Sequence, residues 1–173
     1  MKILLAPQIV QRLRNELRRA GCQEIGGVLM GEDLGGEAFS VVDISVQRSG
    51  GTHSCFIRNQ KDHQDYLKEF FARTGQDYSR FNYLGEWHSH PNFETVPSTP
   101  DIETMQSIVG DPDVGVNFLV LLIVKRVGKE IEASATGFTP LGVPFSIPLA
   151  AESDEKGSDK MGVSGWIRKF FRI

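Results

Sequence analysis

The chain has 173 residues, of which 40% are hydrophobic and 24% charged, with a formal net charge of −3 at pH 7. This composition is typical of a soluble globular protein, and it argues against a nucleic-acid-binding domain, which usually carries a broad basic excess. Cys22 and Cys55 are too few for a disulfide framework. No signal peptide or membrane-spanning run is recognisable, so we expect a cytoplasmic protein.

The two cysteines allow two interpretations. The favoured one is a pair of reduced thiols. The alternative makes Cys55 a metal ligand or a nucleophile near His53, but no partner motif accompanies it.

The predicted elements alternate between helix and strand. In chain order they are a helix at 8–20, strands at 24–31 and 39–46, a helix at 62–73, a strand at 83–88, a helix at 98–109, and strands at 118–124 and 130–138. The glycines of the strand at 24–31 suit a close approach of another backbone. The apolar run at 118–124 is typical of a central strand covered on both faces.

Composition also divides the chain. Residues 1–150 have the size of one domain that can bury its core without disulfides. Residues 151–162 form a polar linker, and residues 163–173 a basic amphipathic segment. On a helix the aromatic face of that segment would bind a membrane surface or a partner groove, or would fold back on its own domain. The sequence leaves these alternatives open.

His88, His90 and Asp101 are candidate ligands of one metal ion. Two histidines at positions i and i+2 of a strand point to the same side, and Pro91 ends that strand. Asp101, in the first turn of the next helix, adds a hard oxygen, and two nitrogens with one oxygen suit Zn²⁺.

Each part of this pattern has a simpler interpretation. Ser98 and Asp101 have the spacing of a helix capping pair, and the two histidines could be ordinary surface residues. Capping and metal binding are compatible, because a cap would fix the helix end that presents Asp101.

A hydrolytic site also needs a general base, and two glutamates compete for that role. Glu86 shares the parity of His88 and His90 along the strand. Glu24 begins a buried, glycine-bearing strand, where an acid needs a partner. Spacing does not decide between them.

Three segments together resemble the signature of the JAMM/MPN metalloproteases: Glu24-Ile-Gly-Gly-Val-Leu-Met-Gly31, His88-Ser-His-Pro91 and Ser98-Thr-Pro-Asp101. The resemblance implies an α/β (α+β) fold of the deaminase-like kind, with a mixed central sheet flanked by helices. It implies that His88, His90 and Asp101 bind Zn²⁺, that Glu24 is the general acid/base, and that Ser98 donates a hydrogen bond to the oxyanion.

Residues 83–91 resemble in particular a bacterial branch found in CBASS anti-phage operons beside ubiquitin-like conjugation proteins. This implies a zinc-dependent peptidase or isopeptidase that cleaves at the C-terminus of a ubiquitin-like or conjugated protein. The implied partner is therefore a protein and not a nucleic acid. Glu86 departs from the eukaryotic pattern, in which an aromatic residue is usual, and the long insertions that select a ubiquitin chain are missing.

Two other functions stay open. One is a non-catalytic binding module. The complete set of predicted metal ligands and the predicted acid argue against it. The other is a zinc hydrolase that processes a sulfur-carrier protein or a small molecule, because the motif specifies the chemistry and not the substrate.

Overall fold

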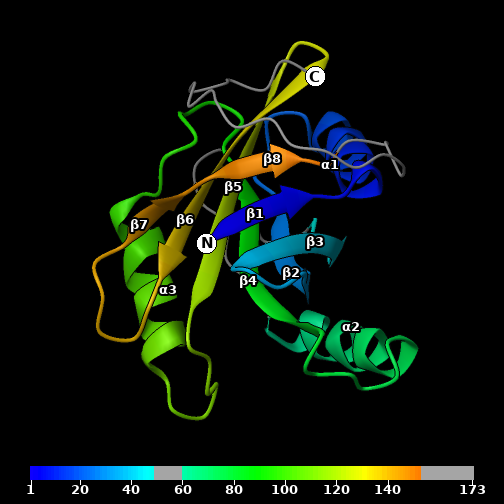
Figure 1. Cartoon of the computed structure of the whole chain (residues 1–173). Helices are drawn as coiled ribbons and strands as arrows, with labels where there is room; N and C mark the ends of the chain where they lie inside the picture. The colour runs from blue at the N-terminus through cyan, green and yellow to red at the C-terminus, as the bar shows by residue number, and fades with distance from the viewer. Residues whose placement is uncertain (49–59, 153–173) are drawn as a thin grey trace, which may run out of the picture.

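The computed structural model describes residues 1–48 and 60–152 (Figure 1). Its elements, in chain order, are β1 (Lys2–Leu5), α1 (Pro7–Ala20), β2 (Gly26–Asp33), β3 (Ala38–Ile44), α2 (Gln60–Arg73), β4 (Phe81–Ser89), α3 (Thr99–Gly110), β5 (Leu119–Val127), β6 (Glu130–Phe138), β7 (Phe145–Ile147) and β8 (Leu149–Ala151). His53, Cys55 and the predicted segment 163–173 lie outside the described residues.

The structure confirms the predicted mixed sheet with flanking helices, and each predicted helix and strand is present. Two details of the prediction were wrong. The strand predicted from Glu24 begins at Gly26, so Glu24 lies just before β2. The short strands β1, β7 and β8 were missed, because three or four residues carry too little periodicity. In addition, β1 and β8 are defined by pairing with strands that are distant in the sequence.

The sheet has the strand order β7-β6-β5-β4-β2-β3-β1-β8. The consecutive strands β7 and β8 lie at opposite edges of it, with only Pro148 between them. This connection requires a strongly curved sheet whose two edges approach each other, as Figure 1 shows. At the closure, the Ile3 N–H donates a hydrogen bond of 2.9 Å to the carbonyl of Pro148.

Helix α1 packs on one face of the sheet, and α2 and α3 pack on the other. The α1 side holds the largest core cluster, to which Leu13, Trp87 and Leu122 contribute as fully buried side chains. Met105 and Val109 of α3 lie in a second cluster, and Phe70 of α2 lies in a third.

Strand β5 connects two of these cores. Val120, Leu122 and Val124 belong to the α1 cluster, whereas Leu119, Leu121 and Ile123 belong to the α3 cluster. All six are at most 2% exposed, which confirms the prediction of a central strand covered on both faces.

Gly27 and Gly85 allow neighbouring backbones to come close to β2 and β4. A Cβ at Gly27 would lie 2.3 Å from the carbonyl oxygen of Ser45, and one at Gly85 would lie 2.0 Å from that of Val120. Gly85 also has a φ of +145°, which other residues rarely adopt. The predicted reason for glycine in this part of the chain is thus confirmed at Gly27.

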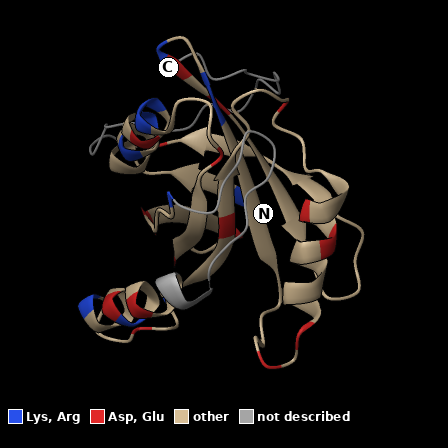
Figure 2. Cartoon of the chain, turned by 180° about the vertical axis from the view of Figure 1, so that it is seen from behind, with Lys and Arg blue, Asp and Glu red and all other residues tan. Residues whose placement is uncertain are grey.

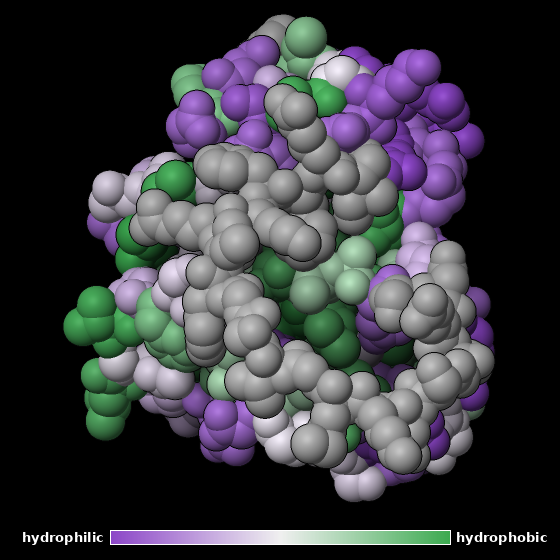
Figure 3. Space-filling model, turned by 45° about the horizontal axis from the view of Figure 1, so that its top comes forward, coloured by the Kyte–Doolittle hydropathy of each residue, from purple (hydrophilic) through white to green (hydrophobic). Residues whose placement is uncertain are grey.

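The charged residues are unevenly distributed. The basic residues of α1 contrast with α3, which carries acidic residues but no Lys or Arg (Figure 2). Hydrophobic side chains are exposed in the loop 91–97, at Phe93 and Val96, and around the β6–β7 loop, at Leu141 and Val143. Figure 3 shows hydrophobic atoms projecting on the side where Figure 1 places the β6–β7 loop. Within the described part of the chain, no helix is long and apolar enough to cross a membrane.

Asp43 of β3 ties the sheet to helices on both of its faces. Its carboxylate accepts hydrogen bonds from Arg12 of α1 at 2.8 Å and from Arg73 of α2 at 2.6 Å. Burial alone would raise the pKa of Asp43, but the hydrogen bond from Arg73 and the charge of Arg12 hold that pKa below its usual range.

We expect Asp43→Asn to lower the free energy of unfolding by about 1–2 kcal/mol at neutral pH. Because the folded-state pKa is depressed, the carboxylate contributes fully above the unfolded-state pKa of about 3.9, and its contribution is lost as the pH falls through the folded-state value. Urea denaturation should therefore give a constant difference between wild type and variant down to about pH 5, and a shrinking one below about pH 4. A difference that is the same at every pH would contradict this assignment.

Candidate metal centre

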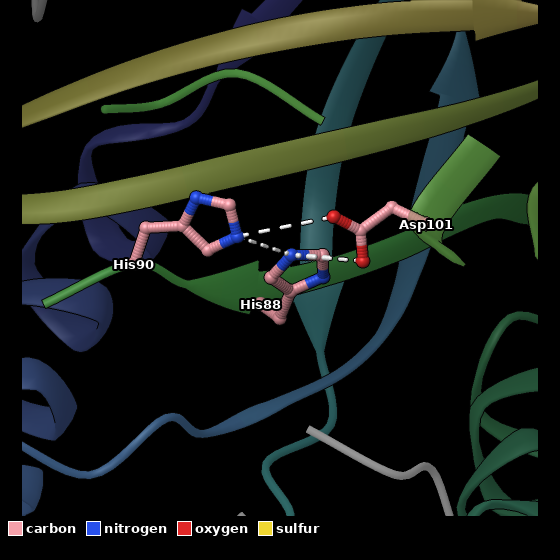
Figure 4. A group of neighbouring side chains, drawn as sticks. All are labelled: His88, His90 and Asp101. Carbon is pink, nitrogen blue, oxygen red and sulfur yellow. Dashed lines mark hydrogen bonds and ion pairs between the residues drawn. The ribbon is translucent and has the colours of Figure 1, made fainter. Parts of the chain in front are cut away.

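His88, His90 and Asp101 meet at the carboxyl end of β4. At this end β4 pairs with the parallel strand β5, and the connection between them runs through α3. Ligand sites in such sheets commonly form at the carboxyl ends of parallel strands. His88 and His90 point toward each other, and Asp101 faces them from the first turn of α3 (Figure 4).

The distances in this group suit one small metal ion. Nε2 of His88 lies 3.0 Å from Nε2 of His90 and 3.5 Å from Oδ1 of Asp101, and Nε2 of His90 lies 3.9 Å from Oδ2 of Asp101. Ligand atoms about 2.0–2.1 Å from a tetrahedral ion are separated by about 3.3 Å. The three side chains therefore form a group that could hold a metal.

The imidazole of His90 is held in the form that binds metals. Its Nδ1 lies 2.8 Å from the carbonyl oxygen of Glu94. A carbonyl only accepts, so Nδ1 carries the proton and Nε2 keeps its lone pair facing the group. Burial lowers the pKa of His90, which also favours the neutral ring.

Asp101 combines a helix cap with its place in the candidate metal centre. The Ser98 side chain accepts a hydrogen bond from the Asp101 N–H at 3.3 Å, and Oδ2 of Asp101 accepts from the Ser98 N–H at 2.7 Å and from the Ser98 hydroxyl at 2.6 Å. Burial would raise the pKa of Asp101, but the contacts with His88 and Ser98 lower it to about 2. Both interpretations of this pair, cap and candidate ligand, thus occur at one residue.

Glu24 lies beside the three candidate ligands. Its side chain is 4% exposed and lines a cleft of about 490 Å³ together with His90, Ser98 and Asp101. Burial raises the pKa of Glu24, while the charge of His88 lowers it and that of Asp101 raises it. The pKa of Glu24 therefore depends mainly on its burial, and then on the charges of two of the predicted ligands.

Glu86 occupies a different environment. It is 8% exposed, and the hydroxyl of Tyr83 donates a hydrogen bond of 3.4 Å to its Oε1. It is not among the residues that line the cleft. Of the two glutamates left open by spacing, the structure brings Glu24, and not Glu86, together with Ser98 and Asp101.

The loop 91–97 forms one wall of the cleft, and hydrogen bonds to β6 hold this loop in place. The hydroxyl of Thr95 donates to Glu132 of β6 at 3.3 Å, and the carbonyl of Thr95 accepts from Ser134. Phe93 packs edge-on against the ring of His90, with 6.3 Å between centroids. Sequence reasoning missed the Glu94 carbonyl and this anchoring, because neither a main-chain acceptor nor a contact with β6 leaves a pattern in the local sequence.

The mixed sheet flanked by helices is the architecture that the JAMM/MPN resemblance implied. The family described as prokaryotic homologs of the JAB domain matches residues 6–136. The chain therefore belongs to the prokaryotic branch of the JAB/MPN family.

Two curated relatives share a name. The chain is 37% identical over 106 residues to a CD-NTase/cGAS isopeptidase of Vibrio cholerae, covering 60% of this chain and 62% of the relative. It is 26% identical over 113 residues to a CD-NTase/cGAS isopeptidase of Enterobacter hormaechei, covering 64% and 60%. The aligned part thus spans less than two thirds of either relative's length.

Solved structures share the fold. A protein from Desulfitobacterium hafniense superposes with a TM-score of 0.63 at 17% identity, covering 89% of this chain and 95% of that protein. A protein from Salinibacter ruber gives a TM-score of 0.53 at 18% identity, covering 92% and 97%. At these identities the likeness establishes the architecture alone.

Replacement of Ser98 tests the cap independently of any activity. We expect Ser98→Ala to lower the free energy of unfolding by about 0.5–2 kcal/mol, because the first turn of α3 loses its side-chain acceptor. Ser98→Thr keeps a capping hydroxyl and should retain most of the stability. Urea denaturation at neutral pH measures both, and an alanine variant as stable as the wild type would contradict the capping role.

Proposed function

We propose that this protein is a zinc-dependent isopeptidase that removes a conjugated protein. The observation that carries the proposal is a cleft lined by the buried acid Glu24 and by His90 and Asp101, which form one group of candidate ligands with His88. Membership of the JAB/MPN family and the isopeptidase names of the two relatives support the reaction class.

His88, His90 and Asp101 would hold the zinc ion. Two imidazoles and one carboxylate are ligands that Zn²⁺ accepts, and three protein ligands leave a coordination position open. Zinc bound in this way would supply Lewis acidity and make a water molecule acidic enough to attack a carbonyl near neutral pH.

Glu24 would move the protons of the reaction. As a carboxylate it would take a proton from the attacking water, and it would then deliver that proton to the departing amine. The acidic residues that line the cleft are Glu24, Glu94 and Asp101, and Glu94 offers its main-chain carbonyl to His90. Of these residues, Asp101 is a candidate ligand and Glu94 contacts His90 through its main chain, which supports Glu24 as the acid/base.

Ser98 would donate a hydrogen bond to the oxyanion that forms when the carbonyl is attacked. Its hydroxyl proton points to Oδ2 of Asp101 in this structure. Rotation about the Cβ–Oγ bond would redirect that proton into the cleft. The bond in which the Asp101 N–H donates to Ser98 Oγ can persist through this rotation, so the cap and the proposed role are compatible.

The substrate follows from the relatives' names and from the chemistry of the cleft. We infer an amide bond between the C-terminus of a CD-NTase or a ubiquitin-like protein and an amine of a second protein. This activity would reverse conjugation within an anti-phage system in the cytoplasm. A protein substrate is also consistent with the acidic overall charge, which suits no nucleic-acid partner.

Metal analysis combined with a cleavage assay tests this function. We expect the purified protein to hold about one zinc ion per chain and to cleave a CD-NTase from the same genome fused through its C-terminus to a fluorescent reporter. His88→Ala should lose the zinc. Glu24→Gln should keep it, while kcat falls about 10²- to 10⁴-fold because the proton acceptor is gone.

A parallel assay with a ubiquitin-like protein fused to the same reporter distinguishes the two substrate classes. Glu86→Gln is the matched control, because it neutralises the other candidate acid and should retain zinc and most of the activity. Full activity of Glu24→Gln, or a protein that binds no zinc, would contradict the proposal.

A further inference from the structure

Ser89 lies between the two candidate histidine ligands in the sequence, but its side chain makes its hydrogen bond elsewhere, to the segment just before β2. Successive residues of a strand point to opposite faces, so Ser89 faces away from the metal centre. Its side chain is buried, at 1% exposure. The hydroxyl therefore has no contact with solvent and must find its partners inside the protein.

The partner of Ser89 is the residue next to Glu24. The N–H of Ile25 donates a hydrogen bond of 3.0 Å to Ser89 Oγ, and the N–H of Ser89 donates one of 2.8 Å to the carbonyl of Ile25. Both main-chain polar groups of Ile25 are thus bound to one residue. Ile25 precedes β2, which begins at Gly26, so these bonds extend the β2–β4 pairing beyond the end of the strand.

These two hydrogen bonds fix the main-chain position of Glu24 relative to the end of β4. The Ile25 nitrogen belongs to the peptide unit that joins Glu24 to Ile25, so holding it also holds the Glu24 main chain. Among the described residues, none donates a hydrogen bond to the carboxylate of Glu24, so the placement of this side chain depends on its backbone. A shift of the acid by about 1 Å is enough to reduce a reaction rate strongly.

We propose that Ser89 is a positioning residue that holds Glu24 in register with His88 and His90. This inference rests on the proposed function, in which Glu24 is the acid/base. One tripeptide then carries two metal ligands on one face and, on the other face, the group that aligns the acid with them. Ser89 touches neither the metal nor the substrate.

Ser45 provides a matched control. Ser45 is also buried, at 5% exposure, and its hydroxyl oxygen accepts a hydrogen bond of 2.8 Å from the N–H of Val28 in β2. Alanine at either serine removes the buried acceptor of one amide, and Ser45→Ala also removes a contact of 2.7 Å with Nδ1 of His63. A purely structural role therefore predicts at least as large an effect of Ser45→Ala, whereas only the bond made by Ser89 lies next to Glu24.

The experiment measures zinc affinity, amide hydrogen exchange and steady-state kinetics of the full chain on the CD-NTase reporter fusion. We expect Ser89→Ala to raise the exchange rate of the Ile25 amide about 5- to 100-fold, because that N–H loses its buried acceptor. We expect kcat to fall about 10- to 100-fold with KM and zinc affinity changed less than about threefold. Ser89→Thr retains the hydroxyl and should restore kcat.

Ser45→Ala should speed exchange of the Val28 amide instead and leave kcat within about threefold of the wild type. Equal losses of kcat in the two alanine variants, or a loss of zinc in Ser89→Ala, would overturn the positioning role. Unchanged kcat in Ser89→Ala beside an inactive Glu24→Gln overturns this inference alone. An active Glu24→Gln overturns the proposed function as well.

Discussion

The candidate site depends on the register between β2 and β4. In this antiparallel pairing Gly26 lies opposite His88, and Gly27 lies opposite Trp87. The residues just before β2 therefore lie beside the carboxyl end of β4, and this places Glu24 near the two histidines. A slip of one residue would turn the side chains of β4 to the opposite face and would place Ser89, rather than the histidines, on the face of the metal centre. The position of the acid is thus a consequence of strand pairing across more than 60 residues of sequence.

Residues outside the candidate site stabilise the register between β2 and β4. Gly27 leaves room for the carbonyl of Ser45, which in turn accepts a hydrogen bond of 2.8 Å from the indole N–H of Trp87. Trp87 is fully buried and lies in the same strand as His88, so packing on the α1 face holds the strand that presents this candidate ligand on the other face. Substitutions far from the cleft can therefore move the histidines relative to Glu24.

Local patterns predicted most of the fold and the spatial grouping of the three candidate ligands, and they could not predict features that depend on pairing between distant strands. The two histidines and Asp101 are near in sequence, and strand parity with a capping motif was enough to group them. Spacing alone could not choose between Glu24 and Glu86, because the choice depends on which strand pairs with β4. The family resemblance favoured Glu24, and the geometry places that residue in the cleft. Strand β8 was beyond prediction for the same reason, because it pairs with β1 at the other end of the described chain, whereas β7 pairs with the neighbouring β6 and was too short to show a pattern.

The charge of the cleft supports the proposed metal ion with an argument that does not depend on the donor atoms. Glu24 and Asp101 are both largely shielded from solvent, and within residues 1–48 and 60–152 neither forms an ion pair with a Lys or Arg side chain. Buried carboxylates are costly unless a cation compensates them. Burial raises the pKa of Glu24, and a nearby positive ion would offset that effect, while the contacts with His88 and Ser98 lower the pKa of Asp101 to about 2. Two carboxylates that pair with no Lys or Arg side chain within the described residues therefore favour a positive ion in this cleft. The same preference follows from the donor atoms of the candidate ligands, on which the proposed zinc site rests.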